Sequence, residues 1–278
     1  MDDTTLKRVQ IELLTIAKEV ARVCYENGIG FFLVGGTLIG AVRHRGFIPW
    51  DDDLDMGMMR ADFERFVQIA PDCLGEGFFL QTWHSDSEYA NAFAKVRMEG
   101  TVYHEANDPK IKKHQGFFVD IFPYDNIPED AAQLSDMSRR IMRYRRIMLA
   151  KNGISLMVRK RGFLRLAKTA VTSALYKVGA VFVSREKLIQ RFEAEMNRFN
   201  GSQTTRVCQE SGGAAFGKYP IKKSYLKTVC NLQFEDTTFP CPGEYDSFLR
   251  DIYGNYMKLP PLKNQKPSHG ILEIKFRD

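Results

Sequence analysis

The chain has 278 residues, of which 44% are hydrophobic and 27% charged, with 21 glycines and 11 prolines. This composition indicates a globular protein and excludes a disordered or collagen-like chain. The five cysteines include no CxxC pair, which argues against a disulfide framework or a clustered zinc site and favours a reducing, cytoplasmic compartment. The acidic N-terminus and the lack of a long uncharged apolar stretch predict neither a signal peptide nor a membrane span.

The net charge of +6 is unevenly distributed along the chain. Residues 137–185 contain 13 Lys or Arg and no Asp or Glu, so the remainder of the chain is acidic on balance. A block of this kind is compatible with binding to nucleic acid, to anionic lipid or to a phosphorylated substrate.

The first elements are read from apolar spacing. Helical periodicity over 6–24, followed by Asn27-Gly28, predicts an amphipathic helix with a stop signal. The apolar run 31–34 predicts a short strand, and Gly35-Gly36 predicts the turn that follows it. Thr37 is the predicted N-cap of a short helix that continues to residue 44.

Asp53 and Asp55 alternate with Leu54 and Met56, and this period of two predicts a strand. Later segments mix strands with long helices, and the last part is rich in proline. The predicted helices cover 62–69, 129–200 in several pieces and 245–256, and the predicted strands cover 78–83, 92–98 and 117–122. Ser184 and Gly201 are the predicted caps of a helix over 185–200. Strands first and helices later predict an α+β (mixed α/β) fold.

Asp53 and Asp55 are the first candidates for chemistry. Two carboxylates two residues apart on a strand point to the same face and can share a hard cation such as Mg²⁺ or Mn²⁺. Asp51 is in phase with them and is a third candidate ligand. The alternative interpretation is a solvated acidic turn or a helix cap.

The Gly35-Gly36-Thr37 turn lies upstream of these acids. Glycines at a strand-to-helix turn allow a phosphate to approach backbone N–H groups, although a bare Gly-Gly is more often a tight turn. Strand, Gly-Gly-Thr, helix and Asp-x-Asp in this order resemble the nucleotidyltransferase fold typified by DNA polymerase β. The resemblance implies that the glycine turn holds nucleotide phosphates, that the acids hold metal, and that a third acid follows on a later strand.

The string GGTLIGAVRHRGFIPWDDDLDMGM, from Gly35 to Met58, resembles the LicD phosphotransferase family, which includes the fukutin-related proteins. Further similarity lies in FVDIFPYD, from Phe118 to Asp125, and in YGNYMKLPP with the following Ser268-His269. Residues 130–200 are the least typical. The resemblance implies transfer of a phospho-alcohol, typically phosphocholine or ribitol phosphate, from a CDP-linked donor to a sugar hydroxyl of a cell-surface glycan or a teichoic acid precursor. Phosphocholine is the first expectation, and ribitol or glycerol phosphate stays open.

The resemblance also assigns roles to single residues. It implies that Asp53 and Asp55 are catalytic metal ligands, and that Asp120 is the third acid and a candidate general base. The alternative for Asp120 is a buried acid paired with Arg or with a backbone amide. Asp125, in a predicted polar loop, is interpreted as a turn former or a substrate contact.

Several cations and aromatic residues are weaker candidates. Arg43 and His44 are predicted phosphate contacts, and the alternative is a solvated helix C-terminus. His269 gains weight from the resemblance alone. Four aromatic residues could enclose a choline cation, although core packing is the default for each; these are Trp50, Tyr89, Tyr103 and Tyr124.

We therefore expect one LicD-like catalytic domain over 1–278, with a nucleotidyltransferase core in 1–130, a basic helical insertion in 131–200 and a C-terminal part, 201–278, that completes the site. The predicted partners are a CDP-alcohol, most simply CDP-choline, and a glycan or lipid-linked glycan acceptor, with no nucleic acid. Residues 139–168 are predicted either to contact an anionic membrane at its inner face or to pack on the core. The alternatives are nucleotidyl transfer and a non-catalytic RNA-binding or membrane-binding protein.

Overall fold

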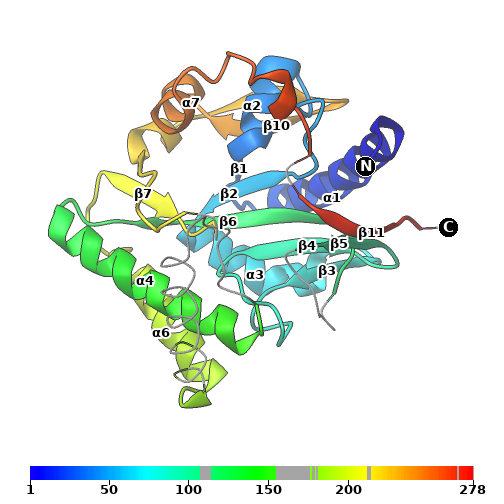
Figure 1. Cartoon of the computed structure of the whole chain (residues 1–278). Coiled ribbons are helices and arrows are strands. Elements are labelled where there is room, and N and C mark those ends of the chain that lie inside the picture. The colour runs from blue at the N-terminus through cyan, green and yellow to red at the C-terminus, as the bar shows by residue number, and fades with distance from the viewer. Residues whose placement is uncertain are drawn as a thin grey trace.

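The computed structural model describes residues 1–106, 114–154, 176, 179, 181–211, 214–267 and 269–277. Its centre is a seven-stranded sheet with the strand order β1-β2-β6-β4-β3, extended from β6 by β7 and then β8 (Figure 1). The strands are β1 (Phe32–Leu33), β2 (Asp55–Met59), β3 (Phe78–Gln81), β4 (Ala94–Met98), β6 (Phe118–Asn126), β7 (Arg206–Gln209) and β8 (Ile221–Lys222). The pair β2 and β6 is parallel and the other pairs are antiparallel.

Two helices cover one face of this sheet. Helix α1 (Asp3–Glu26) contacts β4 and β6, and α3 (Arg60–Cys73) contacts β2, β3 and β6. The apolar positions of α1 repeat at helical spacing and are buried, as the periodicity predicts. Asp2 caps this helix by accepting a hydrogen bond of 2.7 Å from the backbone N–H of Thr5.

A second group of elements lies beside the β1 edge of the sheet (Figure 1). It comprises α2 (Gly35–His44), α7 (Tyr245–Tyr253) and a hairpin of β9 (Val229–Phe234) and β10 (Thr237–Pro242). Strand β10 contacts β1, and β9 contacts α2. The short helices η1 (Lys223–Leu226) and η2 (Leu262–Asn264) belong to the connections, and β5 (Val102–Glu105) pairs with β11 (Ile271–Lys275).

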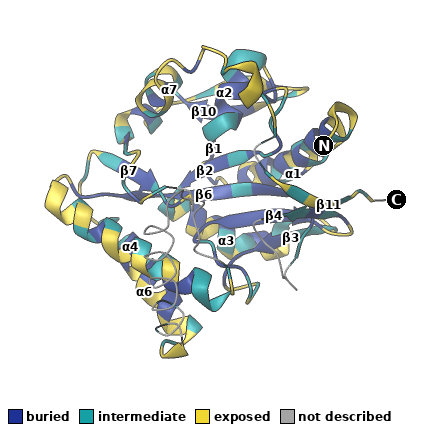
Figure 2. Cartoon of the chain, in the orientation of Figure 1, coloured by how far each residue is buried: buried dark blue, intermediate teal, exposed yellow. Residues whose placement is uncertain are grey.

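Helices α4 (Ala131–Lys151) and α6 (Arg185–Asn197) pack on each other at the other end of the molecule (Figure 1). The apolar side chains of α4, including Met137, Ile141 and Met148, are buried in a cluster with Phe192. Figure 2 shows the complementary exposed face of α4. In residues 139–151 the apolar positions therefore pack on the protein, as in the second of the two interpretations of this segment.

The remaining residues of the predicted membrane-contact segment, 155–168, lie outside the described residues. Within the described ranges, no helix combines the length and the apolar character needed to cross a bilayer.

The structure confirms the mixed α+β class and corrects three local predictions. Thr37 is not an N-cap, because α2 begins at Gly35 with Val34 as its N-cap. Asp53 precedes β2 instead of lying within it. The helix capped by Ser184 ends at Asn197, before Gly201, because its C-cap is Arg198.

Candidate active site

A cavity of about 400 Å³ opens on the sheet face opposite α1 and α3. Strand β6 contributes Phe122 and Tyr124 to its wall, in alternation with residues that face the helices. The predicted site residues that line it are Gly35, Gly36, Asp53, Asp55, Asp120 and His269. Segments far apart in the sequence thus meet in one concave site, which is the usual form of a small-molecule site.

Asp55 and Asp120 are brought together by strand register. The parallel pairing of β2 with β6 makes these two residues direct partners. The backbone N–H of Asp120 donates to the carbonyl of Leu54, 3.0 Å away, which holds this register at the start of β2. Neighbouring strands lie about 4.8 Å apart, so both carboxylates enter the same part of the cavity.

Gly35 and Gly36 allow the N-terminus of α2 to approach the acids closely. Gly35 has a φ of 61°, a conformation that favours glycine. A Cβ atom on Gly35 would lie 2.7 Å from Oδ2 of Asp55, and one on Gly36 would lie 2.7 Å from Oδ2 of Asp51. Thr37 has another role than the predicted cap, because its Oγ1 accepts a hydrogen bond of 2.8 Å from the backbone N–H of Asp55.

The acids form a cluster with excess negative charge. Burial, reinforced by Asp53, raises the pKa of Asp51 to about 8. Burial also raises the pKa of Asp55 well above its ordinary value, with Asp53 and Asp120 adding to the shift. The pKa values of Asp53 and Asp120 are raised as well, chiefly by burial. Such a cluster is stabilised by protons or by a cation.

Lys95 supplies part of the opposing charge. Its ammonium lies 2.8 Å from Oδ1 of Asp120 and 3.2 Å from the ring centroid of Phe118. Asp120 is thus buried beside a cation, as the alternative interpretation of this residue anticipated, although the cation is Lys and not Arg. Strand β4 positions Lys95, because Lys95 and Asp120 are antiparallel partners on β4 and β6.

Asp52 is a functional candidate that the sequence analysis missed. It is fully buried, and its Oδ1 lies 3.1 Å from Nδ1 of His269. Its Oδ2 accepts hydrogen bonds from the Tyr103 hydroxyl, at 3.1 Å, and from the backbone N–H of His269, at 3.3 Å. The one available signal was the acidic run itself, in which Asp52 lies between the two residues predicted to share a face.

His269 lines the cavity and is a second cationic group beside the acids. Its Nε2 lies 3.9 Å from Oδ2 of Asp53 and 3.7 Å from Oε1 of Glu105. Burial lowers the pKa of His269, but the hydrogen bond to Asp52 and the charges of Asp53, Asp52 and Glu105 outweigh burial and raise it to about 9. His269 lies two residues before β11, and the pairing of β11 with β5 fixes the position of this part of the chain.

Arg43 and His44 lie at the C-terminal end of α2, and neither lines the cavity. The Arg43 guanidinium donates to the Tyr256 carbonyl, at 2.7 Å, and to Nε2 of His44, at 2.9 Å. Burial lowers the pKa of both side chains.

The predicted aromatic residues divide into two groups. Tyr124 lines the cavity, whereas Tyr89 and Tyr103 are buried in the core and Trp50 packs against it. The cavity has two further tyrosines, Tyr219 and Tyr253, which the sequence analysis missed.

The interpretation of Asp125 as a turn former or a substrate contact is wrong. Strand β6 continues to Asn126, and Asp125 is fully buried. Its two carboxylate oxygens accept hydrogen bonds of 2.7 and 2.6 Å from the Arg60 guanidinium. Asp125 is therefore a structural partner of α3.

Comparison with known proteins adds independent findings. The family model described as LicD/FKTN/FKRP, nucleotidyltransferase domain, matches residues 28–147. The chain is 31% identical over 272 residues to the lipopolysaccharide cholinephosphotransferase LicD of Haemophilus influenzae, an alignment that covers 97% of both chains. It is 44% identical over 53 residues to the human ribitol 5-phosphate transferase FKRP, covering 19% of this chain and 11% of that protein.

Proposed function

This chain belongs to the LicD family, and we propose from that premise that it is a metal-dependent transferase of phospho-alcohols. The donor is a CDP-alcohol, the acceptor is a sugar hydroxyl of a cell-surface glycan, and CMP is released. The observation that carries the proposal is the convergence of Asp53, Asp55 and Asp120 with Gly35 and Gly36 in one cavity. We propose that these acids and glycines bind a metal ion and the diphosphate of the donor.

The carboxylates suit a hard divalent cation. Asp53, Asp55 and Asp120 supply oxygen ligands, Asp51 adjoins them, and burial is the chief cause of the raised pKa of all four carboxyl groups, which a bound cation would offset. Among the described residues, no three or more His, Cys, Asp or Glu side chains lie in an arrangement that could already hold a metal ion. Mg²⁺ or Mn²⁺, when bound, would neutralise charge on the diphosphate and the leaving group.

The glycines support the donor site. Without side chains, Gly35 and Gly36 leave the first turn of α2 open to the cavity, where backbone N–H groups and the helix dipole favour a phosphate. This arrangement, next to an acid on each of two parallel strands, is the basis on which we propose a nucleotidyltransferase-like core.

The transfer step forms one bond and breaks one bond at the phosphorus nearest the alcohol. The acceptor oxygen attacks this phosphorus, the bond to the bridging oxygen breaks, and CMP leaves with that oxygen. Asp120 is the proposed base that takes the hydroxyl proton, and Lys95, 2.8 Å from it, stabilises its ionised form. The cationic His269 lies on the same cavity wall and can compensate developing negative charge.

Phosphocholine is the proposed group. The relative aligned over nearly the whole chain is named as a cholinephosphotransferase that acts on lipopolysaccharide. Tyr124, Tyr219 and Tyr253 in the cavity wall could face a quaternary ammonium. A glycan of the lipopolysaccharide kind is the proposed acceptor, met on the cytoplasmic side of the membrane, and a teichoic acid precursor is the alternative acceptor.

A labelled donor tests the bond that breaks. We expect CDP-choline labelled on the phosphorus nearest choline to pass its label to a glycan acceptor and leave unlabelled CMP, and we expect no transfer by Asp55→Asn. When no acceptor is supplied, slow hydrolysis to CMP and phosphocholine would report turnover of the donor, and ¹⁸O from labelled water in phosphocholine would report attack at the phosphorus nearest choline. Release of the label as free phosphocholine, with unlabelled CMP joined to the acceptor, would place attack at the other phosphorus and identify a nucleotidyltransferase, which the description of the matched family domain makes the second candidate.

A further inference from the structure

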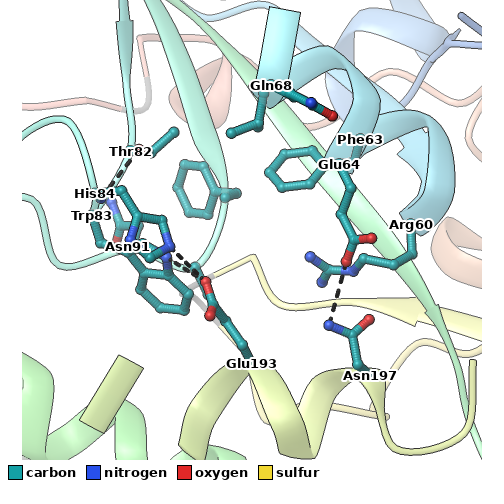
Figure 3. Close-up of a pocket in the computed structure, with 13 residues that line it drawn as sticks. Arg60, Phe63, Glu64, Gln68, Thr82, Trp83, His84, Asn91, Glu193 and Asn197 are labelled. Carbon is teal, nitrogen blue, oxygen red and sulfur yellow. Dashed lines mark hydrogen bonds and ion pairs between the residues drawn. The ribbon is translucent and has the colours of Figure 1, made fainter. Parts of the chain in front are cut away.

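A second cavity, of about 280 Å³, lies between α3, α6 and the segment before β4 (Figure 3). It shares no lining residue with the cavity of the acids. Phe93 lines the second cavity and Phe122 lines the first, and their ring centroids are 4.6 Å apart. The two aromatic side chains thus form part of the wall between two separate spaces.

The inner wall of this cavity is aromatic and fixed in position. Phe63, Trp83 and Phe93 line it, and each is less than a tenth exposed. Trp83 donates a hydrogen bond of 3.0 Å from its Nε1 to Glu193, and its ring packs 5.3 Å from that of Phe192. The volume is close to the lower end of the range for small-molecule sites, about 300 Å³, so the space suits a small compact ligand.

Two carboxylates line this aromatic space, and one of them, Glu193, has its Oε1 2.8 Å from Nε2 of His84. Figure 3 shows Glu64 on α3 and Glu193 on α6 at the edge of the cavity, with Glu193 directed at Trp83 and His84. Among the described lining residues Arg60 is the sole Lys or Arg, and its charge is balanced by the buried Asp125 in a two-bond ion pair. The balance is unfavourable for a phosphate or a nucleotide.

We propose that this cavity binds a small organic cation, of the alkylated ammonium class. Aromatic rings attract such cations through their negative faces, and nearby carboxylates in a partly desolvated space strengthen the attraction. The Arg60 guanidinium lies 5.3 Å from the Phe63 ring centroid, so Phe63 already has a cation of the protein at its face, and Trp83 and Phe93 are the lining rings proposed to face the ligand. The proposal does not rest on the transferase function, because the second cavity contains none of the acids assigned to catalysis.

The two tryptophans of the chain allow a direct test. In Trp50→Phe protein the remaining tryptophan, Trp83, lies in the cavity wall and reports binding by a change in its fluorescence. The titration uses choline, its neutral tert-butyl analogue 3,3-dimethylbutan-1-ol and glucose, without metal or nucleotide. We expect saturable binding of choline and binding of the neutral analogue weaker by roughly tenfold.

Carboxylate variants in the same background complete the test. We expect Glu64→Gln and Glu193→Gln each to weaken choline binding by roughly threefold to tenfold. Glu76→Gln removes the same charge from an exposed position in the turn between α3 and β3 and should leave choline binding unchanged. Glu193 also accepts a hydrogen bond from Trp83, so Glu193→Gln could fail to fold. In that case Glu64→Gln alone tests the proposal. Equal binding of choline and its neutral analogue, binding of glucose alone, no response of Trp83, or unchanged affinity in Glu64→Gln would each overturn the proposal.

Discussion

Asp55 and Asp120 are direct partners on the parallel strands β2 and β6, so their carboxylates share one face of the sheet and one cavity. A shift of the pairing by one residue would place Ile121 opposite Asp55 and turn Asp120 toward the helices. The apolar residues that alternate with the two acids, Met56 and Ile121, are fully buried and oppose such a shift. The packing of the core therefore determines the spacing of the candidate metal ligands.

The first prediction concerns the candidate metal ligands. Asp53→Asn and Asp55→Asn should each reduce transfer by about 10²-fold or more, because loss of even an indirect metal contact costs 10- to 100-fold. Their melting temperatures should stay the same or rise, since each change removes a buried like charge. Turnover and melting are measured on the same samples, with Asp72→Asn on exposed α3 surface as the control. Unchanged turnover would remove that residue from the metal site.

The second prediction is a fall in the stability of the metal-free protein as pH rises. Asp51 titrates at about 8 in the folded state against 3.8 ordinarily, and His269 at about 9 against 6.5. The folded protein therefore binds more protons than the unfolded chain between each pair of values, and the stabilisation is lost as pH rises through the folded pKa. Each extra proton contributes a slope of about 1.4 kcal/mol per pH unit.

Urea unfolding at several pH values in the presence of a chelator measures this slope. Added Mg²⁺ or Mn²⁺ should flatten it, because a bound cation replaces the protons of the acid cluster. A free energy of unfolding that rises as pH increases from the ordinary pKa of His269, 6.5, to its folded value of about 9 would contradict the prediction.

The third prediction concerns ligand-dependent stability. Mn²⁺ or Mg²⁺ together with CDP-choline should raise the melting temperature more than either alone, since both contribute to one site. A ligand at 100 times its dissociation constant adds about 2.7 kcal/mol, which corresponds to several degrees for a chain of this size. A chelator should reverse the effect and Asp55→Asn should abolish it. The same shift with nucleotide in chelator would show that the donor binds without metal.

The fourth prediction assigns Asp52 as a positioning residue for His269. In Asp52→Asn the pKa of the His269 imidazole should fall, because the hydrogen-bonded carboxylate that raises it is gone. Proton NMR titration of the histidines measures this pKa. Tyr103→Phe is the matched control: it removes a hydroxyl contact from the same carboxylate but keeps its charge, so the pKa of His269 should remain high. A similar fall of the His269 pKa in both variants would indicate that each substitution disturbs the local structure around Asp52.

The fifth prediction concerns the Arg60–Asp125 pair. The two side chains are almost completely buried, at 11% and 0% exposed. Asp125→Asn should destabilise the protein by about 3–5 kcal/mol, because it leaves the Arg60 charge buried without its partner. The double variant Arg60→Met/Asp125→Leu should recover much of this loss in urea unfolding. A loss in the double variant equal to the sum of the single losses would show that the two residues do not act as a pair.

Much of the fold was predictable from local patterns. Periodicities of 3.6 and of 2 depend on which side chains of one segment face the core, so α1 and the buried strands can be read from the sequence. The motif from Gly35 to Met58 predicted the family. Asp53 and Asp55 line one cavity as predicted, although Asp53 precedes β2, so the period of a strand is not the reason that the two acids meet. The start of α2 was misplaced, because a glycine with a left-handed φ can begin a helix without any side-chain cap.

The tertiary structure decided which distant residues meet. Asp52 and His269 are 217 positions apart, and Arg60 and Asp125 are 65 apart. Local patterns in the sequence predicted most of the helices and strands, the family motif and the candidate acids. Neither these two pairs nor the second cavity has a local signal, because each depends on how the sheet register and the packing of helices bring buried polar groups to their partners.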